Sequence, residues 1–201
     1  ERELSKQYHI LTRDDRLETV AQDIVRHFLG RGFVGKAMVV SIDKATALKM
    51  HDKVRKHWEM ETALAKKQLG RYELTDDKKN ELLDRLRVLT TTDMALIVSP
   101  GQNEIEQMKK HGLDIVPHRQ RMNDSEPGLD EKFKDTADPL RLVFVCAMWL
   151  TGFDVECLST LYIDKPMKAH TLMQAIARVN RTLGTTTVVI THNASNSHSC
   201  A

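Results

Sequence analysis

Three side chains near the C-terminal end of the sequence have types and a spacing that suit phosphate binding. Gln174, Arg178 and Arg181 recur at i, i+4 and i+7 within Leu172–Arg181, so on a helix they form one stripe. The apolar residues of the same segment fall on the opposite stripe, where they can pack against a core. Because a guanidinium is a planar fork of donors with a permanent charge, it grips phosphate well. The segment therefore predicts a helix that presents phosphate-binding groups along one line; a solvated surface helix is the alternative.

A second group of polar side chains follows the most apolar run of the chain. Thr151, Gly152 and Asp154 come directly after Leu142–Leu150, a run of nine residues that is too short to span a membrane. Its length and its Val and Phe content suit a strand buried on both faces of a parallel sheet. Ligands of open α/β sheets bind at the carboxyl ends of such strands. Gly152 permits close backbone approach, so we expect a ligand site here, with an ordinary loop as the alternative.

Hydrophobic periodicity predicts the elements that must position these groups. We expect a first helix that begins at a capping box, Thr12–Asp15, and ends near Gly30. Strands alternating with helices favour a parallel sheet with helices on both faces. The expected strands are 37–42, 95–99, 141–147, 159–163 and 186–190, and the expected further helices are 44–60, 103–111, a short one around 129–133, and the arginine helix, which ends at 184.

A glycine pattern near the N-terminal end is similar to a phosphate-binding loop. Gly30–Lys36 nearly matches a Walker A motif and contains G-x-G-x-x-G. Both motifs need a strand before the glycines and a helix after them, so that the helix N-terminus meets the phosphate. Here the expected order is reversed, and Ala37 replaces the Ser or Thr that would bind Mg²⁺. We interpret the segment as a loop that closes the first helix.

Three segments, Phe144–Asp154, Thr160–Lys168 and Leu172–Arg181, together resemble motifs V and VI of superfamily 2 helicases, and more narrowly the motor (R) subunit of type I restriction endonucleases. A further segment, Gly35–Lys44, resembles motif IV of that family. The resemblance runs from about Ile10 to Arg181. It implies a second RecA-like lobe, an α/β three-layer domain with a mostly parallel sheet flanked by helices.

The resemblance implies a role in ATP hydrolysis for five residues. Arg178 and Arg181 would act as arginine fingers on ATP held by the other lobe, where a preorganised guanidinium stabilises the charge of the transition state. Gln174 would couple the lobes or orient water, and Gly152 and Asp154 would contact the nucleotide. ATP and Mg²⁺ are the implied cofactors, bound mainly by the first lobe. Because we find no Walker A or Walker B motif in the sequence, we expect no hydrolysis by the isolated chain.

The resemblance also implies DNA contacts and partners. Ser41 and Lys44 match positions that track the DNA backbone, and Thr151 joins them. The expected partners are double-stranded DNA, the first lobe and the nuclease domain of the same subunit, and the methylation and specificity subunits. Lys165 and Lys168 are expected to be surface charges rather than phosphate ligands. Trp149 is expected to pack in the core against the arginine helix, with base stacking as the alternative.

Composition is compatible with this interpretation without selecting it. The 201 residues, 41% of them apolar, suffice for one sizeable core, and the net charge of +2 does not by itself indicate nucleic acid. Three cysteines without metal spacing indicate free thiols in a reducing cytosol. No signal peptide or membrane helix is recognised, so we expect a cytoplasmic protein. Because the sequence begins with Glu1 rather than Met, we expect a fragment.

The expected domain covers 1–184, with a charged helical insertion at 61–92 and an atypical tail at 185–201 that begins as a strand and then becomes disordered. Two features depart from the resembled family. Glu156 stands where relatives have Pro, and the sequence after Arg181 no longer follows the family. The alternative functions are a lobe of another superfamily 2 DNA helicase or remodelling motor, and a non-catalytic interaction module with the same fold.

Overall fold

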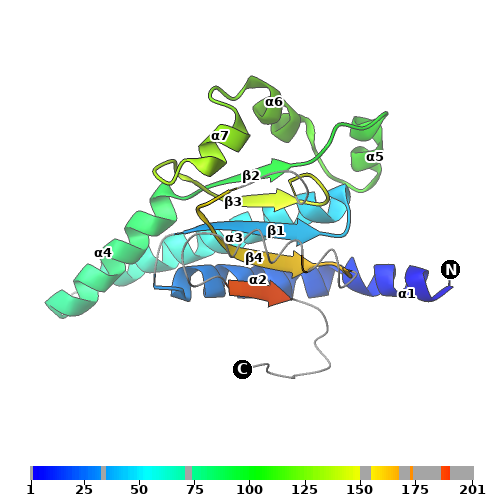
Figure 1. The fold of residues 1–201 in the computed structure, drawn as a ribbon. Helices are drawn as coiled ribbons and strands as arrows, with labels where there is room; N and C mark the ends of the chain where they lie inside the picture. The colour runs from blue at the N-terminus through cyan, green and yellow to red at the C-terminus, as the bar shows by residue number, and fades with distance from the viewer. Residues whose placement is uncertain are drawn as a thin grey trace.

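A five-stranded parallel sheet with helices on both faces forms the fold in the computed structural model (Figure 1). The structure describes residues 2–32, 35–70, 74–149, 155–167, 173 and 187–190. The expected α/β class is confirmed, with the parallel sheet of a RecA-like lobe. In chain order the elements are α1 (Arg2–Leu11), α2 (Asp14–Gly30), β1 (Lys36–Ser41), α3 (Lys44–Leu69), α4 (Asp76–Thr91), β2 (Asp93–Ile97), α5 (Glu104–Lys110), α6 (Val116–Asp124), α7 (Leu129–Lys134), β3 (Leu140–Val145), β4 (Leu158–Asp164) and β5 (Thr187–Ile190).

The strand order, β2-β3-β1-β4-β5, places β1 at the centre of the sheet. The register aligns Val40 of β1 with Val145 of β3 on one side and with Ile163 of β4 on the other. The chain runs from β1 out to β2, returns to β3, and then crosses β1 to reach β4. The direction of winding therefore changes at β1, and in open α/β sheets such a switch point is where ligands bind, outside the carboxyl ends of the strands.

One face of the sheet packs against α2 and α3. The helical spacing of apolar residues expected in α2 is confirmed, because all of the residues that define it are buried: Leu17, Val20, Ala21, Ile24 and Phe28. At the far side of α3, the indole Nε1 of Trp58 donates a hydrogen bond of 2.9 Å to the carbonyl of Leu89, which ties α3 to α4. The cluster on this face includes Leu17, Ile24 and Phe28 of α2, Leu48, Val54 and Trp58 of α3, and Val39, Leu96, Phe144 and Tyr162 of the strands.

A separate core fills the opposite face of the sheet. Phe133 of α7 is fully buried there, and the ring of Trp149 stacks on it with centroids 5.8 Å apart. Trp149 thus packs against the core as expected, although its ring partner in the described structure is Phe133. The strands contribute to both cores, which explains their nearly continuous apolar runs. Their members on this face include Met38, Val40, Ala95, Ile97, Val143, Val145 and Leu161.

The N-terminal end of α2 differs from the sequence prediction. The capping box at Thr12–Asp15 is wrong: Arg13 is the N-cap and makes no side-chain cap hydrogen bond. The reason is that a helix precedes it. Residues of α1 were not expected to be helical, and the hydroxyl of Thr12 donates to the carbonyl of Tyr8 in that helix, 2.9 Å away. Arg16 then caps the C-terminal end of α1, since its Nη1 donates to the carbonyl of Leu11 at 3.0 Å.

The charged segment 61–92 forms the end of α3 and all of α4. α3 continues without a break from Lys44 to Leu69, so the proposed first boundary of an insertion falls inside a helix. The hairpin of α3 and α4 projects beyond the amino ends of the strands in Figure 1. Whether 61–92 is an insertion relative to relatives stays a prediction, as does the domain boundary at 184. Among the residues that the structure describes, no helix has the length and apolarity needed to cross a bilayer.

Candidate functional site at the carboxyl edge of the sheet

The segments that hold most of the predicted site residues leave the sheet at its carboxyl edge. β3 ends at Val145 and β4 begins at Leu158, so the segment between them starts at that edge. β4 ends at Asp164 and β5 begins at Thr187, so the second segment starts there too. Met173 of the second segment is helical and 63% exposed. The predicted residues themselves lie outside the described residues, and their roles stay predictions: Thr151, Gly152, Asp154, Gln174, Arg178 and Arg181.

Ser41 lies at the carboxyl end of the central strand. Its side chain is fully buried, and its register partner on β4 is Asp164. Within the described part of the chain, the Ser41 hydroxyl has no hydrogen-bond partner. A buried hydroxyl left in this state costs about 1–3 kcal/mol, and buried groups of this kind call for an explanation such as a ligand, a water or another segment of the chain. The hydroxyl lies inside the edge rather than on its surface, and the predicted contact with DNA stays a prediction.

Lys44 is the first residue of α3 and is held by a network from α5 and α6. The N-cap of α3 is Asp43, whose carboxylate accepts the backbone N–H of Thr46 at 2.7 Å. The Nζ of Lys44 lies 3.3 Å from Oε1 of Glu104, and its side chain is one-quarter exposed. Glu104 in turn accepts from Nη2 of Arg119 at 2.8 and 2.9 Å. The ammonium is therefore oriented by a carboxylate that a second cation already holds.

The residue at position 101 leaves room for this ammonium. A Cβ on Gly101 would lie 3.0 Å from Nζ of Lys44, closer than ordinary van der Waals contact. A glycine at this position thus permits the lysine head to lie against the backbone between β2 and α5. Among the predicted site residues that the structure describes, Lys44 has a charged side chain that is partly exposed. Its ammonium is therefore accessible to an anion at the carboxyl edge.

The carboxyl end of β4 is anchored to α2 by a buried ion pair. Nη2 of Arg16 lies 2.5 Å from Oδ1 of Asp164, and Nη1 of Arg16 donates to Oδ2 at 3.3 Å. Asp164 is 1% exposed, so the pair is almost fully removed from water on the carboxylate side. Sequence reasoning missed this pair, because 148 positions separate its members. It fixes the point from which the segment with Arg178 and Arg181 departs.

Lys165 links the ends of β3 and β4. Its Nζ donates a 2.7 Å hydrogen bond to the carbonyl of Cys146, and burial lowers the pKa of the lysine. The expectation of a surface charge at Lys165 is therefore wrong, because half-burial and a backbone acceptor hold the ammonium against the sheet edge. Lys168 lies outside the described residues. Cys146 is a free, buried cysteine, as expected, and burial raises the pKa of its thiol.

The elements that flank the near-Walker segment argue against a phosphate site there. Helix α2 precedes the glycines and strand β1 follows them, as expected, which is the reverse of the order that phosphate binding needs. Lys36 is 2% exposed, and its Nζ donates to the carbonyls of Lys132 and Leu140 at 2.7 and 2.9 Å. Its ammonium thus serves backbone acceptors at the amino end of the sheet, far along β1 from Ser41.

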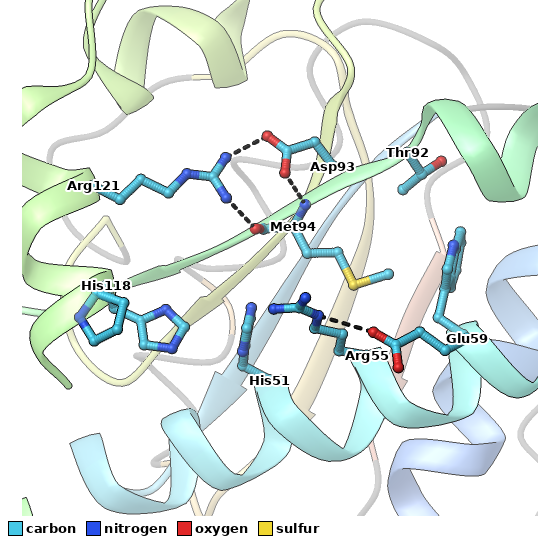
Figure 2. Close-up of a pocket in the computed structure, with 10 residues that line it drawn as sticks. His51, Arg55, Glu59, Thr92, Asp93, Met94, His118 and Arg121 are labelled. Atoms are coloured by element: carbon cyan, nitrogen blue, oxygen red, sulfur yellow. Dashed lines mark hydrogen bonds and ion pairs between the residues drawn. The ribbon is translucent and has the colours of Figure 1, made fainter. Parts of the chain in front are cut away.

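A second polar cluster lies away from the carboxyl edge, between α3, α6 and the amino end of β2 (Figure 2). We call it the α3–α6 pocket. Two histidines of this pocket, His51 and His118, contact each other edge to face, with ring centroids 4.6 Å apart. Burial, followed by the effect of His51, lowers the pKa of His118 to about 4. Sequence reasoning missed this pocket, because its histidines are far apart in the chain. The residues that line it are His51, Arg55, Trp58, Glu59, Thr92, Asp93, Met94, Pro117, His118 and Arg121.

Comparison with known proteins gives the family of the chain. A family model described as domain 3 of the type I restriction enzyme subunit R matches residues 42–189. The chain is 34% identical over 174 residues to the type I restriction enzyme HindI endonuclease subunit of Haemophilus influenzae, a match that covers 86% of this chain and 14% of that protein. A type I restriction enzyme endonuclease subunit of Methanocaldococcus jannaschii is also 34% identical, over 86% of this chain and 13% of that protein.

A subunit of the same description from Staphylococcus saprophyticus is 52% identical over 40 residues, which cover 20% of this chain and 4% of that protein. The chain spans about one-seventh of the length of the two relatives that it matches over most of its own length. The family model matches well over half of the chain, from the residue after β1 into β5. The chain therefore belongs to the type I restriction enzyme subunit R family, within which it matches domain 3.

Proposed function

We propose that this chain is the second motor lobe of an ATP-dependent DNA translocase in a type I restriction-modification system. The observation that carries the proposal is the strand order. β3 and β4 lie on either side of β1, and both end at the same edge of the sheet. The two segments with the helicase-like motifs follow these two strands. Their starting points therefore flank the switch point at β1, where the fold places ligands.

Local contacts support a common site for the two segments. The hydrogen bond from Lys165 to the carbonyl of Cys146 joins the first residues after β4 to the first residues after β3. The pair of Arg16 and Asp164 holds the end of β4 on α2. Because both departure points are fixed relative to each other, the turn with Asp154 and the segment with the two arginines begin on one rigid base. Such rigidity is what a preorganised electrostatic site requires.

In the proposed site, the two arginines complete an ATP site whose remaining parts come from another lobe of the full subunit. Arg178 and Arg181 would stabilise the charge on the transferring phosphoryl group, and Gln174 would orient water or couple the lobes. Gly152 and Asp154 would contact the nucleotide. The Mg²⁺ and the phosphates would be held mainly by the other lobe, so the isolated chain would bind ATP weakly and would not hydrolyse it.

Lys44 is the group through which the edge would meet DNA, with Ser41 and Thr151 beside it in the proposal. Its side chain is one-quarter exposed, and its ammonium shares Glu104 with Arg119. A DNA phosphate can replace Glu104 as its partner because Arg119 keeps that carboxylate satisfied. In the full subunit, Lys44→Ala should weaken DNA binding to a similar extent for every sequence and reduce the salt slope of the affinity by about 1. The nuclease domain, the methylation subunit and the specificity subunit complete the proposed assembly.

The proposal is tested by substituting each arginine in the full subunit. Arg178→Ala and Arg181→Ala should leave DNA affinity close to wild type, whereas DNA-stimulated ATP hydrolysis should fall by about a thousandfold or more for the dominant finger. Arg26→Ala is the matched control, because Arg26 is an arginine with a 71% exposed side chain on α2. Turnover at the wild-type rate in both finger variants would overturn the proposal, as would loss of ATPase in the control.

A further inference from the structure

Three metal-ligating side chains meet at the α3–α6 pocket. His51 and Asp52 are consecutive residues of α3, and His118 belongs to α6. One ring nitrogen of each histidine and one carboxylate oxygen of Asp52 all lie within 4.8 Å of one another. We propose that His51, Asp52 and His118 bind a divalent transition-metal ion of the Zn²⁺ type. This site is separate from the carboxyl edge of the sheet and does not depend on the proposed motor function.

The geometry needs only a small closure to hold an ion. Bonds of about 2.0–2.1 Å from zinc to nitrogen or oxygen place neighbouring ligand atoms about 3.0–3.4 Å apart. Nδ1 of His51 already lies 3.0 Å from Oδ1 of Asp52, so an ion between them would replace the hydrogen that they share. The widest separation in the cluster, up to 4.8 Å, must shrink by about 1.5 Å to reach that spacing.

The three side chains differ in mobility in a way that suits this closure. His51 is 3% exposed, and its ring packs edge-on against Phe144 of β3 with centroids 5.3 Å apart. It is therefore fixed by the core. Asp52 has a side chain that is 55% exposed, and His118 is partly exposed at the pocket mouth. Both can rotate toward the fixed imidazole without disturbing the core.

The ligand set selects the class of metal. Two imidazoles and one carboxylate suit Zn²⁺, Co²⁺, Ni²⁺ or Cu²⁺, whereas Mg²⁺ and Ca²⁺ prefer sites made of oxygen atoms. Three protein ligands leave a coordination position for water. This cluster would thus bind the Mg²⁺ that accompanies ATP poorly, and binding here can be separated from nucleotide binding by the choice of ion.

The charges around the pocket favour a cation over an anion. Arg55 lies 3.2 Å from Glu59, and the guanidinium of Arg121 pairs with Asp93 and also donates to the carbonyl of Met94 (Figure 2). Each guanidinium that lines the pocket is therefore matched by a carboxylate that also lines it. Asp52 adds a further negative charge beside the two imidazoles. An anion would find its cationic partners already engaged, whereas a cation gains a carboxylate.

An ion at this site would join α6 to the main body of the lobe. α6 has no fully buried residue; it is held by the partly buried Met122 and by polar contacts of Arg119 and Arg121. A bond from His118 to an ion on α3 would add a coordination link to these contacts. Since the ion would bind the folded chain and not the unfolded one, it would raise the unfolding temperature, and the rise would grow with the logarithm of its concentration relative to its Kd.

The test measures binding of Zn²⁺ alone to the 201-residue chain, by calorimetric titration and by thermal unfolding with and without the ion. The wild type should bind one Zn²⁺ and unfold at a higher temperature in its presence, while Mg²⁺ should leave the unfolding temperature unchanged. His118→Ala and Asp52→Ala should each weaken binding by at least about tenfold, since even residues that only orient ligands cost that much. His111→Ala is the control, because His111 is an exposed histidine at the end of α5.

Binding that is lost in both ligand variants and kept in His111→Ala supports the site. Failure of Zn²⁺ to shift the unfolding temperature of the wild type overturns it, as does equal binding by all four proteins, which would indicate adventitious surface histidines. Circular dichroism without metal establishes that each variant is folded. If His118→Ala is not folded, the exposed position of Asp52 makes Asp52→Ala the deciding variant.

Discussion

The buried ion pair between Arg16 and Asp164 anchors the carboxyl end of β4 on α2, and Asp164→Ala removes one member of it. The carboxylate is 1% exposed and the Arg16 side chain 16% exposed. Breaking a buried pair from one side costs about 3–5 kcal/mol, because the remaining charge is left without compensation. Arg16 keeps its hydrogen bond to the carbonyl of Leu11 at 3.0 Å, so we expect the lower end, about 3 kcal/mol.

The assay is urea unfolding of the 201-residue chain followed by circular dichroism. Proteins of this kind are stable by about 5–15 kcal/mol, so a loss of this size is large but leaves a folded population. With a slope of about 2 kcal/mol per molar urea, the midpoint should fall by about 1.5 M. The slope itself should not change, because the substitution removes an interaction in the folded state without altering the surface exposed on unfolding.

Asp23→Ala is the matched control for this prediction. Asp23 is also an aspartate paired with an arginine, Arg26, but the side chains are 60% and 71% exposed. Pairs of this kind contribute about 0–1 kcal/mol, so the control midpoint should move by less than about 0.5 M. Equal midpoints for Asp164→Ala and Asp23→Ala would refute the reasoning that burial makes the pair at the edge an anchor.

Three further substitutions test other parts of the structure. The hydrogen bond from Lys53 lowers the pKa of the Glu18 carboxyl from 4.5 to about 2. The stabilisation by the ionised carboxylate is therefore complete above pH 4.5 and is lost as the pH falls through 2. The difference in unfolding temperature between wild type and Glu18→Gln should disappear as the pH is lowered from 4.5 to 2. Lys36→Met leaves buried carbonyls without a donor and should cost about 1–3 kcal/mol in urea unfolding, while the ATPase rate of the full subunit stays unchanged if Lys36 has no phosphate role. Trp58→Phe removes the donor to the carbonyl of Leu89 and should cost about 1–3 kcal/mol, whereas an unchanged midpoint would show that this bond does not hold α4 to α3.

The strands and α2 could be predicted from the sequence because the faces that they bury determine the spacing of their apolar residues. Leu142–Val145 is apolar throughout because β3 is covered on both faces, and the periodic apolar residues of α2 all face one core. α6 could not be predicted in the same way. Its sequence has no apolar stripe, and it is held by polar contacts such as those of Arg121 with β2 and of Arg119 with Glu104.

The candidate site, too, could be predicted only in part. The positions of the two motif segments relative to the sheet follow from sequence order, once the strands are assigned. The surroundings of individual side chains do not, since they depend on contacts between distant parts of the chain. Lys165 is half-buried only because Cys146 lies on the neighbouring segment, and Asp164 is paired only because α2 brings Arg16 to it. His51 and His118 meet for the same reason.

The central claim is that two arginines of this lobe face the triphosphate held by another lobe of the same subunit. It is tested most directly by an experimental structure of the full subunit with DNA and a non-hydrolysable ATP analogue. We expect a guanidinium nitrogen of Arg178 or Arg181 within hydrogen-bond distance of a γ-phosphate oxygen, about 2.7–3.2 Å. A closed complex in which both guanidiniums point away from the nucleotide, or are engaged by carboxylates of their own lobe, would contradict the account.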